Sequence, residues 1–247
     1  SVIAQLGCPF RCRFCGGRDS HVFRITRSRS TASVIAEIRD VVVAGQTGRG
    51  PPMTAVMFYD DELNVTRSGL EDLCRGLIDL QADLTVDMRF RGFVKAELFT
   101  KEQAELMYRA GFRTILSGIE SGSDRILDAM SKNTSRELNA RCLKFAQGAG
   151  LRFKALMSLG HPGESQDTIR ESIEWVLTYR PDDVDWTLIT QYPGSPYYDY
   201  SESQGDHWVY VDPGSGDKLY SAEPDFLKEA CFYKGVPGAY VSYVWTD

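Results

Sequence analysis

Residues 7–15 read GCPFRCRFC, so that Cys8, Cys12 and Cys15 follow one another with the spacing C-x3-C-x2-C directly after the apolar run at 2–6. We call residues 7–15 the cysteine loop. Three thiolates within one loop can surround a single inorganic centre. An iron–sulfur cluster normally takes four protein thiolates, and no fourth cysteine lies near these three. The spacing therefore predicts a cluster with one iron left open to another ligand.

A structural zinc ion is the alternative for the same cysteines. His21 lies six residues beyond Cys15 and would complete a Cys3His set. Structural zinc sites more often place paired ligands on two separate loops, and the chain lacks a second pair. We therefore favour the cluster and keep zinc as the alternative.

The overall composition is that of a globular protein. The chain has 247 residues, 43% of them hydrophobic and 25% charged, which is enough for one large core. Its formal net charge of −6 argues against broad nucleic-acid binding, which needs a basic face. No apolar run approaches the roughly 20 residues that span a bilayer, and no signal peptide is visible. We expect a cytoplasmic protein without membrane or nucleic-acid partners.

Apolar stretches alternate with segments of helical periodicity along most of the chain. The intervals between the apolar stretches are close to the roughly 30 residues of a βαβ unit. This pattern predicts an α/β fold with parallel strands, a partial (β/α)6 TIM-like barrel over residues 1–195. Residues 196–247 are predicted to form a loop-rich C-terminal extension that packs on or closes the barrel, with one short helix near 225–233. The predicted strands span 2–6, 55–59, 85–90, 114–118, 153–159 and 184–190. Capping boxes predict three helix starts, at Ser68 with Glu71, Thr100 with Gln103, and Thr134 with Glu137.

Polar or flexible residues follow almost every predicted strand. In parallel α/β folds the functional residues gather where strands end and helices begin, so these segments should converge on one face. They are the cysteine loop, Asp60-Asp61-Glu62, Arg89 with Arg91, and the stretches at 118–123, 160–164 and 191–194. The sequence therefore predicts a site at this end of the barrel.

Together these features resemble the radical S-adenosylmethionine (SAM) superfamily. The C-x3-C-x2-C loop after the first strand, with the aromatic Phe14 before the last cysteine, is similar to that family's signature. The stretches GIESGS at 118–123, LGHPGES at 159–165 and QYPGSPYY at 191–198 look like motifs of its cobalamin-associated branch. Many members of that branch methylate or rearrange unactivated carbons. The resemblance covers roughly residues 1–200.

The resemblance implies a cofactor set and a list of binding residues. Cys8, Cys12 and Cys15 would hold three irons of a [4Fe–4S] cluster, and its fourth iron would chelate SAM. Reductive cleavage would give a 5′-deoxyadenosyl radical, with an electron donor such as flavodoxin or ferredoxin as partner. Many relatives have Gly-Gly-Glu where this chain has Asp60-Asp61-Glu62. The implied SAM-binding residues are Phe14, Asp60, Asp61, Glu62, Arg89, Arg91, Glu120, Ser121, Leu159, Gly160 and Tyr192.

Several of these residues also have structural explanations, which stay open at this point. The acidic run at 60–62 would serve equally to cap the following helix, because acidic residues favour helix starts. Ser123 has a structural explanation as the N-cap of the following helix, a position that serine favours. Cys74 and Cys142 lie on apolar helical stripes and are predicted core residues. Cys231, in the extension, is the candidate catalytic residue as a reactive thiol over the barrel mouth, with a buried structural role as its alternative.

We therefore predict a radical SAM enzyme that modifies a small-molecule substrate. Methylation of an unactivated carbon with the help of cobalamin is the expected reaction. Rearrangement, dehydration or ring closure without cobalamin is the alternative, and a non-catalytic module pinned by zinc or a cluster is the alternative from another class. Relatives that use cobalamin carry a separate binding domain before the cysteine loop. Because the chain starts at Ser1 and enters a strand at once, we expect it to be a segment of a longer protein.

Overall fold

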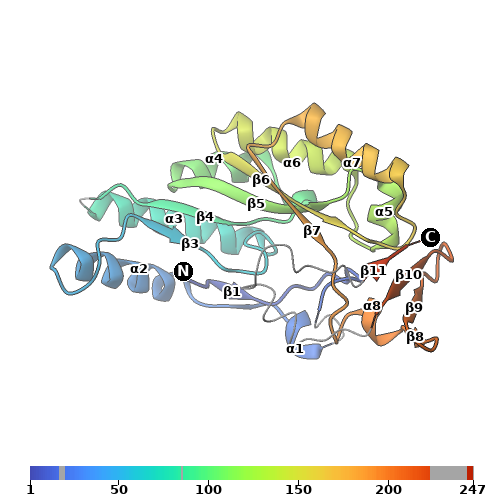
Figure 1. The fold of residues 1–247 in the computed structure, drawn as a ribbon. Helices are drawn as coiled ribbons and strands as arrows, with labels where there is room; N and C mark the ends of the chain where they lie inside the picture. The colour runs from blue at the N-terminus through green and yellow to red at the C-terminus, as the bar shows by residue number, and fades with distance from the viewer. Residues whose placement is uncertain (17–19, 85, 223–243, 247) are drawn as a thin grey trace.

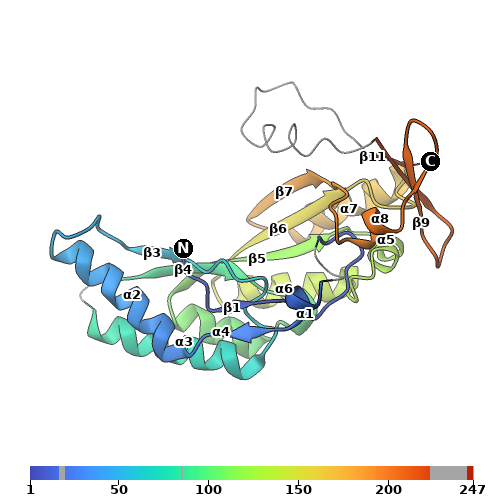
Figure 2. The same ribbon diagram turned by 90° about the horizontal axis from the view of Figure 1, so that it is seen from below.

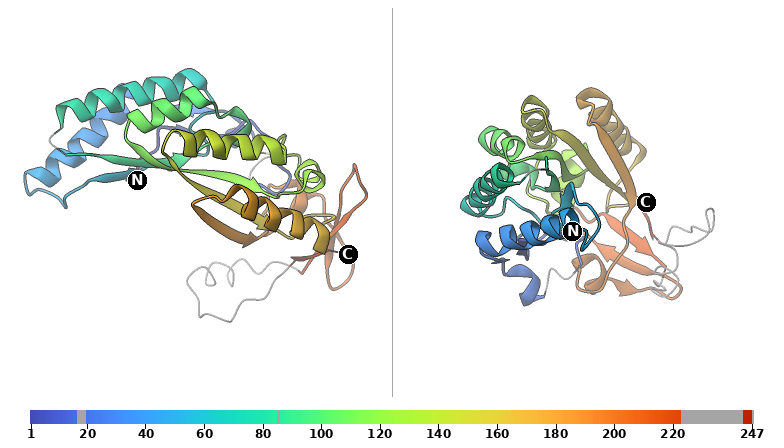
Figure 3. Two further views of the ribbon diagram at one scale, coloured as in Figure 1. Left: turned by 90° about the horizontal axis from the view of Figure 1, so that it is seen from above. Right: turned by 90° about the vertical axis from the view of Figure 1, so that its left-hand side faces the viewer.

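The computed structural model describes residues 1–16, 20–84, 86–222 and 244–246. A parallel sheet with the strand order β3-β4-β5-β6-β7 lies at its centre and curls into a half barrel (Figures 1 and 3). Its strands are β3 (Ala55–Met57), β4 (Arg89–Phe93), β5 (Phe112–Glu120), β6 (Arg152–Leu159) and β7 (Asp183–Leu188). This architecture confirms the predicted α/β fold of the partial TIM-like barrel type.

Helices cover the outer, convex face of the sheet (Figure 3). Between sheet and helices lies a core that includes Phe58, Phe90, Phe112 and Phe153, all at most 2% exposed. Burying each such ring contributes about 2–3 kcal/mol. None of the described helices is both long and apolar enough to cross a lipid bilayer. The helices are α1 (His21–Arg24), α2 (Thr31–Gln46), α3 (Arg67–Asp83), η1 (Ala96–Leu98, a 3-10 helix), α4 (Lys101–Arg109), α5 (Asp124–Ala129), α6 (Arg136–Gly148) and α7 (Gln166–Tyr179).

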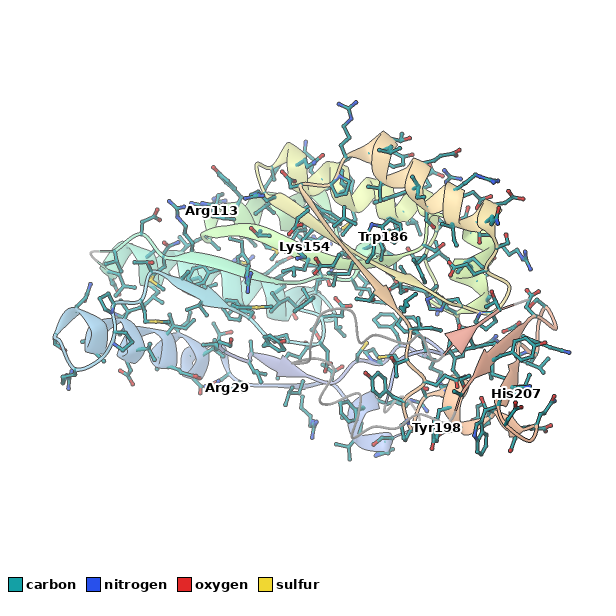
Figure 4. The ribbon with its side chains drawn as sticks, in the orientation of Figure 1. Arg29, Arg113, Lys154, Trp186, Tyr198 and His207 are labelled. Carbon is teal, nitrogen blue, oxygen red and sulfur yellow. The ribbon has the colours of Figure 1, made fainter. Side chains whose placement is uncertain are left out.

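The inner, concave face of the sheet carries charged side chains. Arg89 and Arg91 alternate along β4 with the buried Phe90 and are both exposed, so they share this face. On β6, Lys154 bridges the carboxylates of Asp183 and Asp185 on β7, at 3.1 and 2.8 Å (Figure 4). These side chains reach solvent, and the sheet's apolar contacts are on its other side.

The predicted first strand at 2–6 is wrong as a full member of the barrel sheet. Val2 makes one isolated parallel bridge to Phe58, and β1 (Gln5–Leu6) pairs antiparallel with β2 (Arg27–Ser28) instead. The physical cause is the carboxylate of Asp60, which accepts the backbone N–H groups of Ala4 and Gln5. A side chain therefore takes the hydrogen bonds that a neighbouring strand would otherwise supply.

Strand β4 also differs from the prediction. A strand was predicted over residues 85–90, and β4 begins at Arg89. The backbone N–H of Met88 donates to Oε1 of Gln81 on α3 (3.0 Å), which anchors the segment before the strand to a helix. Residue 85 lies outside the described part of the chain.

Of the three predicted capping boxes, only the one at Thr100 and Gln103 is confirmed. Helix α3 begins two residues earlier than its box predicts, with Thr66 as N-cap in place of Ser68 and no side-chain cap bond. Helix α6 begins one residue later, because Ser135 takes the N-cap position and its hydroxyl accepts the N–H of Leu138 (3.1 Å). Ser and Thr residues one or two positions apart compete for the same role, and the tertiary packing selects between them.

The extension is more regular than the loop-rich prediction. It begins with α8 (Pro196–Asp199) and continues as an antiparallel sheet of order β11-β10-β9-β8. This sheet lies beside α5, at the end of the half barrel where β5 ends (Figures 1 and 2). The predicted helix near 225–233 lies outside the described residues. The strands are β8 (Glu202–Ser203), β9 (Trp208–Val211), β10 (Lys218–Ser221) and β11 (Val244–Trp245).

Close packing of β5 against α7 generates a stability prediction. A Cβ at Gly122 would lie 2.6 Å from the carbonyl oxygen of Glu171 and 2.7 Å from Cα of Ser172, so the backbone of α7 would have to move. We expect Gly122→Ala to lower the free energy of unfolding by about 1–3 kcal/mol, measured by urea denaturation. Gly148→Ala, at the end of α6, is the matched control, because no atom from another part of the chain lies within 4 Å of its added Cβ. Equal stability of the two variants would contradict the packing argument.

Candidate functional site

The cysteine loop is held by backbone hydrogen bonds on both of its flanks. The N–H of Cys8 donates to the carbonyl of Phe23 in α1 (2.9 Å), and the N–H of Arg13 donates to that of Met130 after α5 (2.9 Å). The loop therefore bridges two segments more than a hundred residues apart. Cys8 and Cys12 are buried, and Cys15 is half-buried.

Two aspartates fix the approach to this loop. The carboxylate of Asp61 accepts the N–H of Gly7 (2.6 Å), and that of Asp60 holds the preceding residues. Gly7 has a φ of +93°, and a Cβ there would lie 2.2 Å from the carbonyl oxygen of Ile25, so only glycine fits. Burial raises the pKa of Asp60 to about 6, although its backbone hydrogen bonds oppose the shift. Both aspartates therefore position the start of the loop.

Glu62 differs from its two neighbours in having an unsatisfied oxygen. Its Oε2 is buried and has no hydrogen-bond partner among the described residues. Burial raises the pKa of Glu62 to about 7, while the positive charges of Lys132 and Lys95 oppose the rise. Because Thr66 is the N-cap of α3, the helix-cap explanation of residues 60–62 is wrong. A buried carboxylate oxygen without a partner is suited to accept a hydrogen bond from a ligand.

A buried ion pair closes the site at the carboxyl end of β5. Nζ of Lys132 donates to Oε1 of Glu120 (2.7 Å), and the hydroxyl of Ser158 donates to Oε2 (2.8 Å). Burial by itself would raise the pKa of Glu120, but these two partners hold it below its usual value. Glu120 has a φ of +62°, a left-handed conformation that costs on the order of 1 kcal/mol for a non-glycine residue. Both oxygens of its carboxylate are hydrogen-bonded in that conformation.

A second buried lysine, Lys95, lies beside the first. Its Nζ is 2.6 Å from Oε1 of Glu97 and donates to the backbone carbonyl of Lys132 (3.3 Å). We call Glu62, Lys95, Glu97, Glu120 and Lys132 the buried charge cluster. Sequence reasoning missed both lysines and Glu97. A signal did exist for Lys95, which stands between the apolar residues Val94 and Ala96, two residues after β4 ends.

His161 connects this cluster to the extension. Its Nε2 lies 2.7 Å from the hydroxyl of Ser158 and its Nδ1 lies 3.3 Å from the hydroxyl of Tyr197. The ring of Phe14 packs edge-on against the imidazole, with 5.4 Å between centroids. Burial lowers the pKa of His161 to about 4, so the ring is neutral at pH 7. The imidazole thus links Phe14 of the cysteine loop to β6 and α8.

Other predicted residues lie near the same end of the barrel. Ser121 is buried, with its Oγ 3.1 Å from Oγ of Ser172 on α7, so its hydroxyl takes part in joining β5 to α7. Gly160 follows Leu159, the last residue of β6, and donates its N–H to the carboxylate of Glu164. Tyr192 is 40% exposed. The assignment of these residues to SAM stays a prediction.

Arg89 and Arg91 lie apart from this group. Arg89 is the first residue of β4, about 13 Å before the carboxyl end of the strand at the usual rise per residue. It is exposed, with its Nε 4.0 Å from Asp87. Arg91 is exposed on the same face. Both side chains reach solvent, and their assignment to SAM stays a prediction.

The remaining cysteines and the zinc alternative can be placed as well. Cys74 and Cys142 belong to the main core, as predicted, and burial raises the pKa of Cys74 to about 12. In the described part of the chain, no group of three or more His, Cys, Asp or Glu side chains has a geometry that could hold a single metal ion. The predicted zinc set of three cysteines with His21 therefore does not form there. A cluster places each thiolate on a different iron. Cys231 lies outside the described residues.

Comparison with known proteins gives one family match and several relatives. A family model described as the radical SAM superfamily matches residues 2–176. An uncharacterized methyltransferase of Pyrococcus horikoshii is 26% identical over 200 residues, which are 81% of this chain and 41% of that protein. The anaerobic magnesium-protoporphyrin IX monomethyl ester cyclase of Rubrivivax gelatinosus is also 26% identical, over 78% of this chain and 33% of its own.

Among solved structures, the radical S-adenosylmethionine methyltransferase TsrM of Kitasatospora setae, with cobalamin and a [4Fe–4S] cluster bound, has a similar fold. The TM-score is 0.72 at 17% identity, over 87% of this chain and 40% of that one. At this identity the likeness concerns the fold. The chain spans less than half the length of each of these three proteins.

The buried imidazole predicts a pH dependence. Because its pKa of about 4 lies below the ordinary 6.5, the unfolded chain binds more protons between these values. The contribution of His161 to stability should therefore fall as the pH drops from about 6.5 to about 4, by roughly 3 kcal/mol in total. In an NMR titration the imidazole should remain neutral at pH 5.5, with His161→Gln used to assign its signal. A midpoint near 6.5 would contradict the burial argument.

Proposed function

Since the chain belongs to the radical SAM superfamily, we propose that it is the radical SAM core of a methyltransferase-type enzyme that modifies a small molecule. The observation that carries the proposal is the cysteine loop, which Asp61 ties at Gly7 to the segment of Glu62, whose buried Oε2 has no partner among the described residues. The methyltransferase names of two similar proteins support the reaction type. Ring closure by a radical route is the second candidate, favoured by the similarity to a cyclase.

The residues present fit a [4Fe–4S] cluster and SAM. The donor set is three thiols within eight residues, and thiolates are the usual ligands of iron–sulfur clusters. A carboxylate oxygen that lacks a hydrogen bond stands ready for a cationic donor such as the amino group of SAM. When bound, the cluster and SAM supply the one-electron chemistry of the reaction.

In this proposal the chain itself binds, orients and excludes water. Cys8, Cys12 and Cys15 hold three irons, and Glu62 accepts the SAM amino group. The neutral imidazole of His161 packs edge-on against the ring of Phe14 and orients that ring without adding a charge. The extension supports this enclosure, because the N–H of Tyr197 donates to the carbonyl of Arg13 (3.2 Å). These roles position reactive groups; the bond-breaking chemistry belongs to the cofactors.

Cobalamin enters the proposal through the structural neighbour that binds it. We assign no described residue to cobalamin and derive no step through it. An electron donor such as flavodoxin or ferredoxin, and the division at residue 195 between barrel and extension, likewise remain proposals. Detection of S-adenosylhomocysteine as product would favour methyl transfer, whereas 5′-deoxyadenosine without a methylated product would favour the radical ring closure.

The cluster assignment can be tested with single cysteine variants. After anaerobic reconstitution with iron and sulfide, Cys12→Ala should lose most of the cluster absorbance and bound iron, because one of only three protein ligands is gone. Cys74→Ala is the matched control: it removes a fully buried thiol from the core and should keep the full iron content. An unchanged iron content in Cys12→Ala would overturn the assignment.

Glu62 provides a separate test of SAM binding. Glu62→Gln keeps the size of the side chain but removes the negative charge, so the Kd for SAM should rise at least tenfold while the cluster absorbance stays intact. Glu105→Gln, an exposed glutamate on α4, serves as the control. Isothermal titration calorimetry of the reconstituted proteins measures the Kd for SAM in both variants. An unchanged Kd in Glu62→Gln would remove Glu62 from the site.

A further inference from the structure

Two buried lysines each face an aromatic ring of the cysteine loop. Nζ of Lys95 lies 4.3 Å from the centroid of Phe10, which stands between the first and second cysteines. Nζ of Lys132 lies 5.7 Å from the centroid of Phe14, between the second and third. The lysines are only 4% and 7% exposed. The inner side of the loop therefore rests on two positive charges.

Packing alone does not require a charge at either position. Burying an ammonium group costs several kcal/mol unless a carboxylate partner is buried with it, and an apolar side chain of similar volume is often no worse. A methionine at 95 or 132 would cover the same ring without Glu97 or Glu120. The desolvation of these buried charges lowers the stability of the fold, and the packing of the loop does not explain why the charges are there.

The pair of Lys132 and Glu120 is also oriented. Its ammonium end lies 5.7 Å from the centroid of Phe14, the residue directly before Cys15. The other oxygen of Glu120 is held by the hydroxyl of Ser158 on β6 (2.8 Å). The pair thus presents its positive end to the cysteine loop and its negative end to the sheet.

We propose that Lys132, supported by Lys95, is a positioning residue that holds the cysteine loop and raises the reduction potential of the iron–sulfur cluster. Reduction adds one electron and makes the cluster more negative by one charge. A nearby positive charge stabilises that reduced form, and it does so more strongly in a protein interior than in water. The inference rests on the cluster of the proposed function but is independent of SAM binding and methyl transfer.

The test is a redox titration of the reconstituted cluster in the absence of SAM and substrate, with dithionite as the source of electrons. In Lys132→Met the ratio of reduced to oxidised cluster at a given potential should fall at least tenfold, a midpoint more negative by at least 59 mV for one electron. Lys132→Arg keeps the charge and should stay within threefold of the wild type. Lys144→Met is the matched control, because Lys144 also covers a ring, that of Tyr179 at 5.3 Å, away from the loop.

Each outcome bears on the proposal. A lowered midpoint in Lys132→Met with normal values in Lys132→Arg and Lys144→Met supports it. An intact cluster with an unchanged midpoint in Lys132→Met overturns it. If Lys132→Met and Lys132→Gln both take up no cluster while Lys132→Arg does, the positive charge is needed to hold the loop, which supports the positioning role. Loss of the cluster in all three variants overturns it in favour of packing. A wild-type protein that takes up no cluster refutes the proposed function itself.

Discussion

The buried ion pair between Lys132 and Glu120 is the interaction on which the site depends. It joins the turn after α5 to the carboxyl end of β5, and through Ser158 it reaches β6. Removing one partner of such a pair leaves an uncompensated buried charge, which costs about 3–5 kcal/mol. Glu120 itself has a left-handed backbone, with a φ of +62°. The ends of two strands and the support beneath the cysteine loop are thus coupled through one carboxylate.

The start of the chain is organised by carboxylates of another kind. Asp60 and Asp61 stand where many members of the family have glycines, and their side chains accept backbone N–H groups of Ala4, Gln5 and Gly7. They thereby draw the N-terminal segment out of the parallel sheet and direct it into the cysteine loop. The departure from Gly-Gly-Glu has a structural explanation, and Glu62 keeps its unsatisfied oxygen in the same segment.

The extension is joined to the cysteine loop by polar contacts. Arg13, within the loop, pairs with the buried carboxylate of Asp212 after β9 and donates to the carbonyl of Ala129 (3.1 Å). Arg125 on α5 pairs with Asp217 at 2.9 Å. With Tyr197 buried behind the loop, the antiparallel sheet is attached to the outer side of the segment that would carry the cluster. Residues about 200 positions apart therefore share one local structure.

Local patterns determined a large part of this protein. The spacing of Cys8, Cys12 and Cys15 and the alternation of apolar stretches with helical segments predicted the parallel half barrel and the end of it that carries polar residues. Periodicity and turn chemistry depend only on residues close together in the chain, so they can be recognised from the sequence alone. The cap at Thr100 and the core positions of Cys74 and Cys142 were predictable for the same reason.

Only the tertiary structure decided how the distant parts meet. No local pattern indicates that Lys132 would pair with Glu120, or that Asp60 would take the hydrogen bonds of Ala4 and Gln5, because each contact joins segments that only the fold brings together. The exposure of Arg89, the register of β4 and the small sheet of the extension were set in the same way. A buried charge is strongly destabilising unless an opposite charge is buried beside it. Which residues form such a pair is decided by the three-dimensional packing.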